Sequence, residues 1–338
     1  MGKRKGKKRS RLRRVSLKAG CVLAVLFAIW GTAGEWYVHH PRAWIAERPK
    51  WMTDALGLVG NPLADLTDAL NLTGYDTVCE YDTEAPAGAV AFAGLPVRVG
   101  EPAPADIRVL DRGAFKIGWS DSLRHPVWCA YHVTREPRCQ NLERPSFAKD
   151  PELARSPKPN DYAKSGYDRG HMAPNYAIVT RFGPDAQKKT FLTSNIAPQS
   201  PALNRGVWRE VEHRIADLWT ARYGEIWVVV GSIPSAACPE TISGTGIEVP
   251  KGFYQVIIAQ EGMDVRALAV LFDQTVGWND WPARHIVTID ELEALTGLDF
   301  NPELPSFIQD PLESDLPNRL WPIRPLDIFS QIALRFFQ

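Results

Sequence analysis

Short runs of apolar residues, separated by polar and turn-forming segments, recur along the chain and are typical of β-strands. Residues 226–230 are five apolar residues in succession, which predicts a central strand buried on both faces of a sheet. Shorter runs predict further strands near residues 89–92, 115–117, 128–133, 177–180, 191–196, 254–259 and 268–272.

Two segments have the features of helices. Val207, Val211, Ile215 and Leu218 recur every three or four residues and would form one apolar stripe, so we predict a helix over 206–223. Residues 288–292 predict a second, short capped helix. Because the order mixes many strands with a few helices, we expect an α+β domain whose strands pair mostly antiparallel.

The polar, proline-rich segment 135–166 predicts a long loop of the kind that carries function. Proline and glycine also crowd residues 84–104, which indicates extended or edge structure there.

Composition adds a charge asymmetry to this picture. The 338 residues are 45% hydrophobic and 23% charged, as in globular proteins, and the formal net charge is zero. Residues 1–18 hold ten Lys and Arg and no acid, which leaves 29 basic and 39 acidic residues in the rest. Overall charge is therefore no argument for nucleic-acid binding. Segment 134–189 has eleven basic and seven acidic residues, which fits either a local positive cleft or a mixed solvated surface.

The amino terminus has the pattern of a targeting segment. Residues 19–34 are sixteen consecutive uncharged residues, short for a membrane span of about 20 and long for a signal core of roughly 7–15. We expect residues 1–18 to be a basic cytoplasmic tail and 19–38 a signal anchor. The remaining protein would then be periplasmic or extracellular. A cleaved signal followed by secretion is the alternative, as is a basic nucleic-acid-binding tail at 1–18.

Three further parts follow in the predicted organisation: a stalk with short helices at 39–85, one large domain at 86–310 and a tail at 311–338. Outside Cys21 there are four cysteines, at 79, 129, 139 and 238. They allow three disulfide pairings, which an exported protein would permit. Buried free thiols are the alternative.

The segment 168–178, which begins Asp-Arg-Gly-His, carries the chemistry. On a strand, Arg169 and His171 would share a face. A histidine can accept a proton from water near neutral pH, and an arginine grips phosphate through its planar fork. Gly170 would leave room for a substrate backbone. This combination suits phosphodiester hydrolysis, whereas a buried histidine propped by Asp168 is the structural alternative.

Further strings extend this motif: Thr-Ser-Asn-Ile-Ala-Pro-Gln at 193–199 and Leu-Asn-Arg-Gly-Val-Trp at 203–208, flanked by matches at 131–134 and 294–300. In this order, from residue 128 to 302, they resemble the DNA/RNA non-specific endonuclease family. The resemblance implies a ββα-metal (His-Me finger) nuclease domain with a central, mostly antiparallel sheet. Helix 206–223 and the strands of the motif would form its ββα unit.

The resemblance also assigns roles to single residues. It implies that His171 is the general base, Arg169 and Arg144 stabilise the phosphate, Glu212 holds metal-bound water, Asn195 supports the histidine, and Asn204 binds the metal. A lone carboxamide ligand suits Mg²⁺, which keeps most of its water, and Mn²⁺ could substitute.

Three of these assignments have a structural alternative. Asn204 could cap a helix, Glu212 could be a solvated helix charge, and Arg144 could pair with Glu143 or Asp150. His132 fits packing better than catalysis.

The sequence thus predicts a metal-dependent endonuclease acting on DNA and/or RNA. It contains no Cys-x-x-Cys, His-Glu-x-x-His or Gly-x-x-x-x-Gly-Lys motif, which argues against a structural zinc, a zincin protease and a P-loop ATPase. Two other functions stay open: an inactive nuclease-like binding scaffold, and a phosphodiesterase acting on small molecules. Some members of the family form homodimers, and the sequence does not test whether this chain does.

Overall fold

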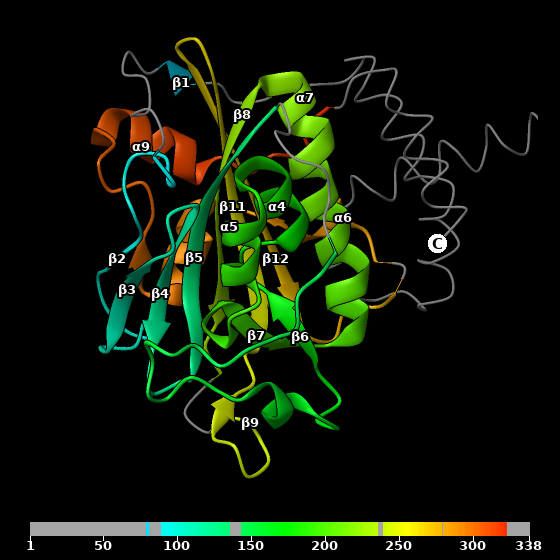
Figure 1. Cartoon of the computed structure of the whole chain (residues 1–338). Coiled ribbons are helices and arrows are strands. Elements are labelled where there is room, and N and C mark those ends of the chain that lie inside the picture. Colours follow the sequence, from blue (N-terminus) through cyan, green and yellow to red (C-terminus); the bar gives the residue numbers. More distant parts are fainter. Residues whose placement is uncertain (1–78, 81–88, 136–142, 236–238, 279, 323–338) are drawn as a thin grey trace, which may run out of the picture.

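The computed structural model describes residues 79–80, 89–135, 143–235, 239–278 and 280–322 (Figure 1). The predicted basic tail (1–18), signal or anchor segment (19–38) and nearly all of the stalk (39–85) lie outside these residues, as do Cys139, Cys238 and 323–338. Within the ranges given, no helix combines the length and the apolar character that crossing a bilayer requires.

An eight-stranded antiparallel sheet forms the centre of the protein (Figure 1). The strand order is β1-β12-β11-β8-β5-β4-β3, and β13 also pairs with β12. The strands are β1 Cys79–Glu80, β3 Ile107–Asp111, β4 Phe115–Ser120, β5 His125–Thr134, β8 Glu225–Ile233, β11 Gly252–Glu261, β12 Asp264–Asp273 and β13 Ile286–Val287. The predicted α+β class and antiparallel pairing are confirmed.

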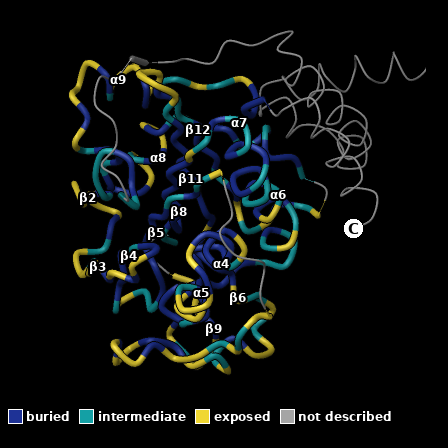
Figure 2. The backbone as a smooth tube through the Cα atoms, turned by 45° about the horizontal axis from the view of Figure 1, so that its top comes forward, coloured by how far each residue is buried: buried dark blue, intermediate teal, exposed yellow. Residues whose placement is uncertain are grey.

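Strand β8 lies in the middle of the sheet, between β5 and β11. Its alternate residues belong to different cores: Ile226, Val228 and Val230 face one, and Trp227 and Val229 face the other. Burial on both faces explains why this strand is a continuous apolar run, as predicted. Figure 2 shows the central strands β5, β8, β11 and β12 largely in the colour of buried residues, within the interior of the molecule.

One face of the sheet is covered by α4 Asn175–Phe182, α5 Pro184–Thr190 and a long helical rod (Figure 1). The rod comprises η3 Leu203–Val207, α6 Trp208–His213, η4 Arg214–Trp219 and α7 Thr220–Tyr223, and it is kinked at Gly206, whose φ and ψ are not helical. The four residues of the predicted stripe are all buried, so the helix expected at 206–223 is confirmed. Beside it, the ribbon of β6 Asp168–His171 and β7 Ile196–Gln199 completes the ββα unit.

The opposite face carries α8 Ile289–Thr296, α9 Ser306–Ser314 and the strand pair β2 Val97–Arg98 with β14 Leu298–Asp299. Helix α8 begins where the sequence predicts. The hydroxyl of Thr288 accepts from the Glu291 amide at 3.0 Å, and the Glu291 carboxylate accepts from the Thr288 amide at 3.1 Å. This reciprocal capping satisfies two backbone donors that the first turn leaves free.

Three predicted strands differ from the structure. Residues 177–180 lie in α4, and 89–92 form an irregular turn segment. Residues 191–196 contain a 3₁₀ turn (η2 Thr193–Asn195), and the strand starts at Ile196. Residues 177–181 of α4 are all buried, and a short helix buried all round cannot be distinguished from a buried strand by periodicity.

The folded body extends beyond the predicted boundary at 310, which falls inside α9. Trp321 is buried against Trp219 and Tyr223, with ring centroids 5.5 and 5.3 Å apart. The indole of Trp219 also donates to the Trp321 carbonyl at 3.0 Å. Cys129 is a buried free thiol in the central sheet, as the alternative to a disulfide expected.

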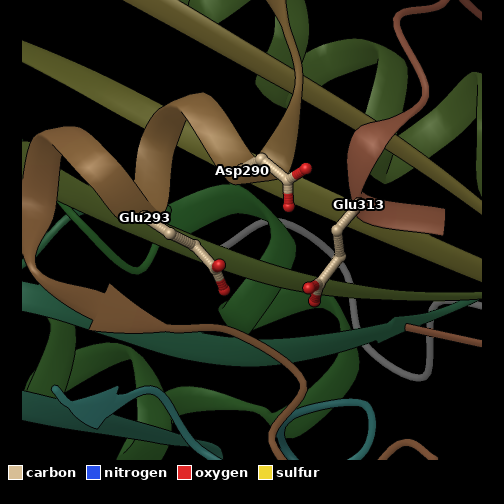
Figure 3. A group of neighbouring side chains, drawn as sticks. All are labelled: Asp290, Glu293 and Glu313. Carbon is tan, nitrogen blue, oxygen red and sulfur yellow. The ribbon is translucent and has the colours of Figure 1, made fainter. Parts of the chain in front are cut away.

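Three carboxylates meet between α8 and α9 (Figure 3). Asp290 and Glu293 come from α8 and Glu313 from α9, and each offers an oxygen within 4.8 Å of the others. Glu313 is 3% exposed and accepts from Asn301 at 3.1 Å. Burial, together with the neighbouring acids, raises the pKa of Glu313 to about 8 and that of Glu293 to about 7.

We predict that Glu313→Gln stabilises the protein at pH 8 by on the order of 2 kcal/mol. The glutamine still accepts from Asn301 but does not ionise. Because the pKa of Glu313 is higher in the folded protein than its ordinary 4.5, its stabilising contribution is complete below pH 4.5 and is lost as pH rises through about 8. Chemical denaturation at pH 5 and pH 8 should therefore show a large difference between the two proteins only at pH 8. An equal difference at both pH values would contradict this explanation.

Candidate active site

A cleft of about 670 Å³ opens beside the β6–β7 ribbon. Its walls come from β6, the first turns of the helical rod and the loop before β6. Five basic residues line it, against two acidic ones. The basic residues are Arg144, Lys164, Arg169, Arg205 and Arg209; the acidic ones are Asp168 and Glu212. The local positive cleft that the charge pattern allowed is thus present, and it would attract a polyanion.

His171 lies at the end of β6, where it pairs with Ile196 of β7. Its ring packs against Phe147 and Phe191, with centroid distances of 5.3 and 4.9 Å, and the residue is 9% exposed. This burial, with Arg144 and Arg169 nearby, lowers the pKa of His171 to about 3. The imidazole is therefore neutral at physiological pH, as a general base must be.

Arg169 and Arg144 each lie over one of the two aromatic rings that contact His171. The Arg169 guanidinium is 4.5 Å from the Phe147 ring centroid, and that of Arg144 is 5.4 Å from the Phe191 centroid. Arg169 and His171 thus contact one ring, Phe147, as expected for two residues on one face of a strand. Their guanidinium groups, both close to His171, could bind a phosphate beside its ring.

The alternative for Arg144, a surface ion pair, is not found. Asp150 is fully buried, where Arg112 and Ser194 donate hydrogen bonds to its carboxylate. Within the described part of the chain, Arg144 pairs with neither Glu143 nor Asp150. Its charge is therefore directed to the cleft, which it lines.

Asn204 lies inside the first turn of the helical rod, because its backbone amide donates to the Ser200 carbonyl at 2.9 Å. It is not the cap residue that the alternative proposed. Its side-chain amide nitrogen donates to Asp168 Oδ2 at 3.0 Å. Burial pushes the pKa of Asp168 up, but hydrogen bonds from Arg205 and Asn204 outweigh it and hold the pKa below its ordinary value. Asp168 thus contacts Asn204 and Arg205, and does not prop His171.

Glu212 lines the cleft together with Asn204, from two helical turns further on. Its Oε1 accepts from the Trp208 indole at 2.9 Å, and the side chain is half-buried. Loss of water raises the pKa of Glu212 to about 8, although Trp208, Arg144 and Arg209 oppose the shift. The alternative of a solvated helix charge is therefore wrong.

Asn195 supports the site from behind. It is fully buried, donates to the carbonyls of Ala173 and Thr190 at 3.0 Å each, and accepts from the Ala173 amide at 2.9 Å. Its backbone carbonyl accepts from Met172 at 2.9 Å. Because these bonds use both side-chain donors, Asn195 can position the segment after His171 but offers no donor to a substrate.

Gly170 has a different role from the one expected. A Cβ atom there would lie 2.1 Å from Oε1 of Gln199, which is fully buried. Glycine is needed for the packing of β6 on this side chain, rather than for the approach of a substrate. The motif also gave no sign of Phe147 and Phe191, which lie in sequence 24 residues before and 20 after His171.

The other histidines in the described ranges make their contacts outside the cleft. The His132 ring stacks on Trp227 at 4.8 Å, as the packing hypothesis expected. His213 bonds Asp217 at 2.9 Å, one helical turn further along. Buried His125 lies 3.4 Å from Glu248.

The residues at the cleft fit a hydrated divalent cation. The side-chain nitrogen of Asn204 donates to Asp168, so the side-chain oxygen of Asn204 is the atom that can bind a cation. Glu212 is a half-buried carboxylate that accepts a hydrogen bond from an uncharged indole. A nearby cation would restore the charged form that burial disfavours. One carboxamide and one carboxylate suit an oxygen-seeking ion that retains its water.

Comparison with known proteins agrees with this geometry. Residues 96–307 match the family model of the DNA/RNA non-specific endonucleases. The mitochondrial nuclease EXOG of Xenopus laevis is 31% identical over 205 residues, 56% of each chain. A nuclease of Nostoc sp. is 34% identical over 170 residues, 47% of this chain and 60% of its own. The nuclease of Serratia marcescens is 28% identical over 213 residues, 60% and 78% respectively.

The chain thus spans little more than half the length of the EXOG relatives that it matches. Among solved structures, a chain of the EndoG/EndoGI complex superposes with a TM-score of 0.54 at 24% identity. The match covers 59% of this chain and 88% of that one. At this identity the likeness shows the fold: a nuclease-type α+β domain around an antiparallel sheet.

We predict that divalent-cation affinity rises with pH between about 6 and 8. In the cation-free protein Glu212 holds its proton below its pKa of about 8, and a cation must compete with that proton. Titration of the EDTA-treated protein with Mn²⁺ at pH 6, 7 and 8 should show this rise, and Glu212→Gln should flatten it. A pH-independent affinity in the wild type would contradict this role for Glu212.

Proposed function

The chain belongs to the DNA/RNA non-specific endonuclease family, and we propose on this basis that it hydrolyses phosphodiester bonds of DNA and RNA with a divalent cation. The observation that carries this proposal is the packing of the His171 ring on Phe147 and Phe191, over which Arg169 and Arg144 lie at a basic cleft. Asn204 and Glu212 line the same cleft as both arginines and Phe147, and His171 packs on Phe147, which supports a role for these residues in one reaction.

In the proposed reaction, His171 takes a proton from the water whose oxygen attacks phosphorus. The bond from phosphorus to the leaving oxygen breaks, and that oxygen gains a proton from solvent. Arg169 and Arg144 stabilise the negative charge of the pentacovalent phosphate. A bound cation, held by Asn204 and by Glu212 through water, would polarise the phosphate; Mg²⁺ fits this ligand set, and Mn²⁺ could replace it.

Substrate binding would also adjust the basicity of His171. Arg144 and Arg169 are two of the three causes of its low pKa. A phosphate between these guanidinium groups would offset their charge, and the pKa of the ring would rise towards the range useful for a base. His171 would thus stay neutral in the free enzyme and become a stronger base in the complex.

The cleft favours a nucleic acid over the two other functions considered. Phosphate and sugar contacts carry no sequence information, so arginines and a lysine along a cleft suit a broad range of DNA and RNA. A small-molecule phosphodiesterase would be expected to have a more closed and apolar pocket. An inactive scaffold has no reason to retain Arg144, Arg169, His171, Asn204 and Glu212 around one site.

The test uses the EDTA-treated full chain with plasmid DNA and with structured RNA, with and without Mg²⁺. We expect cation-dependent cutting of both, and a loss of about 10²–10⁴-fold in His171→Ala, the range for removal of a general base. His213→Gln, a change in the same fold but outside the cleft, is the control and should cut like the wild type. Failure of the folded wild type to cut with either Mg²⁺ or Mn²⁺, or full activity of His171→Ala, would contradict the proposal.

A further inference from the structure

Asp168 links the β6–β7 ribbon to the helical rod through three hydrogen bonds. Its Oδ2 accepts from Asn204 Nδ2 at 3.0 Å and from Arg205 Nε at 2.7 Å, and its Oδ1 accepts from Arg205 Nη2 at 2.6 Å. The side chain is 17% exposed and lines the cleft. The proposed reaction gives this carboxylate no task, although it is bonded directly to Asn204.

A carboxylate determines which way a neighbouring carboxamide faces. An ionised carboxylate has only acceptors, whereas the asparagine side chain has an NH₂ donor on one side and an oxygen acceptor on the other. With Asp168 as neighbour, the nitrogen of Asn204 must face the carboxylate, because the reversed amide would bring two oxygen atoms together. The oxygen of Asn204 is then directed away from Asp168.

This orientation decides whether Asn204 can bind a cation, because the oxygen can ligate a hard divalent ion and the NH₂ group cannot. We propose that Asp168 is a positioning residue for the cation, holding the Asn204 amide in the one orientation that presents its oxygen. The inference rests on the proposed function, in that it takes Asn204 as the ligand.

The residues around Asp168 hold its carboxylate in one position. In β6 it pairs with Gln199, the last residue of β7, and Asn204 follows only five residues later. Arg205, which also lines the cleft and whose side chain is 60% exposed, contacts both carboxylate oxygens. This two-point contact keeps the carboxylate plane from rotating, so the acceptor that faces Asn204 stays in place.

The test measures Mn²⁺ binding to the EDTA-treated full chain without nucleic acid, from the electron paramagnetic resonance signal of free Mn²⁺. Asp168→Asn has the same size but can offer Asn204 either an acceptor or a donor, so the amide is no longer held one way. We expect binding about tenfold weaker, as for other residues that orient a metal ligand. Asp168→Ala, which removes all three bonds, should weaken it at least as much.

Two matched variants separate orientation from simple attachment of β6 to the helix. Arg205→Gln removes the ion pair but leaves the bond between Asp168 and Asn204, and should weaken Mn²⁺ binding far less than Asp168→Asn. In the Asn204→Asp variant, residue 204 has two side-chain oxygens, and either one can face the cation. Adding Asp168→Asn to this variant should therefore no longer weaken Mn²⁺ binding. Thermal unfolding without metal establishes that each variant is folded.

Mn²⁺ binding by Asp168→Asn with wild-type affinity would overturn the inference. So would equal losses in Asp168→Asn and Arg205→Gln, or an undiminished loss in the Asn204→Asp background. A wild-type chain that neither binds Mn²⁺ nor cuts DNA and RNA would instead overturn the proposed function, and the two failures are therefore distinguishable.

Discussion

The removal of His171 from water is the constraint on which the rest of the site depends. An exposed histidine is partly protonated near neutral pH, and the protonated ring cannot accept a proton. Here the ring packs against Phe147 and Phe191, and Arg144 and Arg169 lie over those same two rings. Burial and positive charge act in one direction and keep the imidazole neutral. The arginines that suppress protonation are also those that we propose bind the phosphate.

The fold provides this arrangement by bringing two parts of the chain together. The large sheet supports the helical rod through a core on one of its faces, and the β6–β7 ribbon lies beside the start of that rod. His171 and Arg169 come from the ribbon, while Asn204 and Glu212 come from the rod. The bonds from Asn204 and Arg205 to Asp168 join the two parts at the cleft. This polar contact adds to the hydrophobic core, in which Ala197 of the ribbon lies in the same cluster as Leu203 and Val207 of the rod.

Much of this could be predicted from the sequence, and the exceptions have physical reasons. The helix at 206–223 was predictable because its apolar residues recur every three or four positions, and the central strand at 226–230 because it is an uninterrupted apolar run. Residues 177–180 were predicted as a strand and form a helix, because burial all round removes the polar face that distinguishes the two. The motifs identified Arg169, His171, Asn204 and Glu212 together. Phe147, Phe191 and the bond from Asp168 to Asn204 depend on tertiary contacts between distant segments, for which a single sequence has no signal.

The protonation state of His171 tests the central claim most directly. Nuclear magnetic resonance of the chain labelled with ¹⁵N-histidine, with His171→Gln to assign the signal, would follow the ring nitrogens between pH 4 and 8. The structure predicts a neutral ring down to pH 5, because the pKa is lowered to about 3. A ring that titrates near 6.5, the ordinary value for histidine, would contradict the claim that burial and the two arginines hold the base neutral.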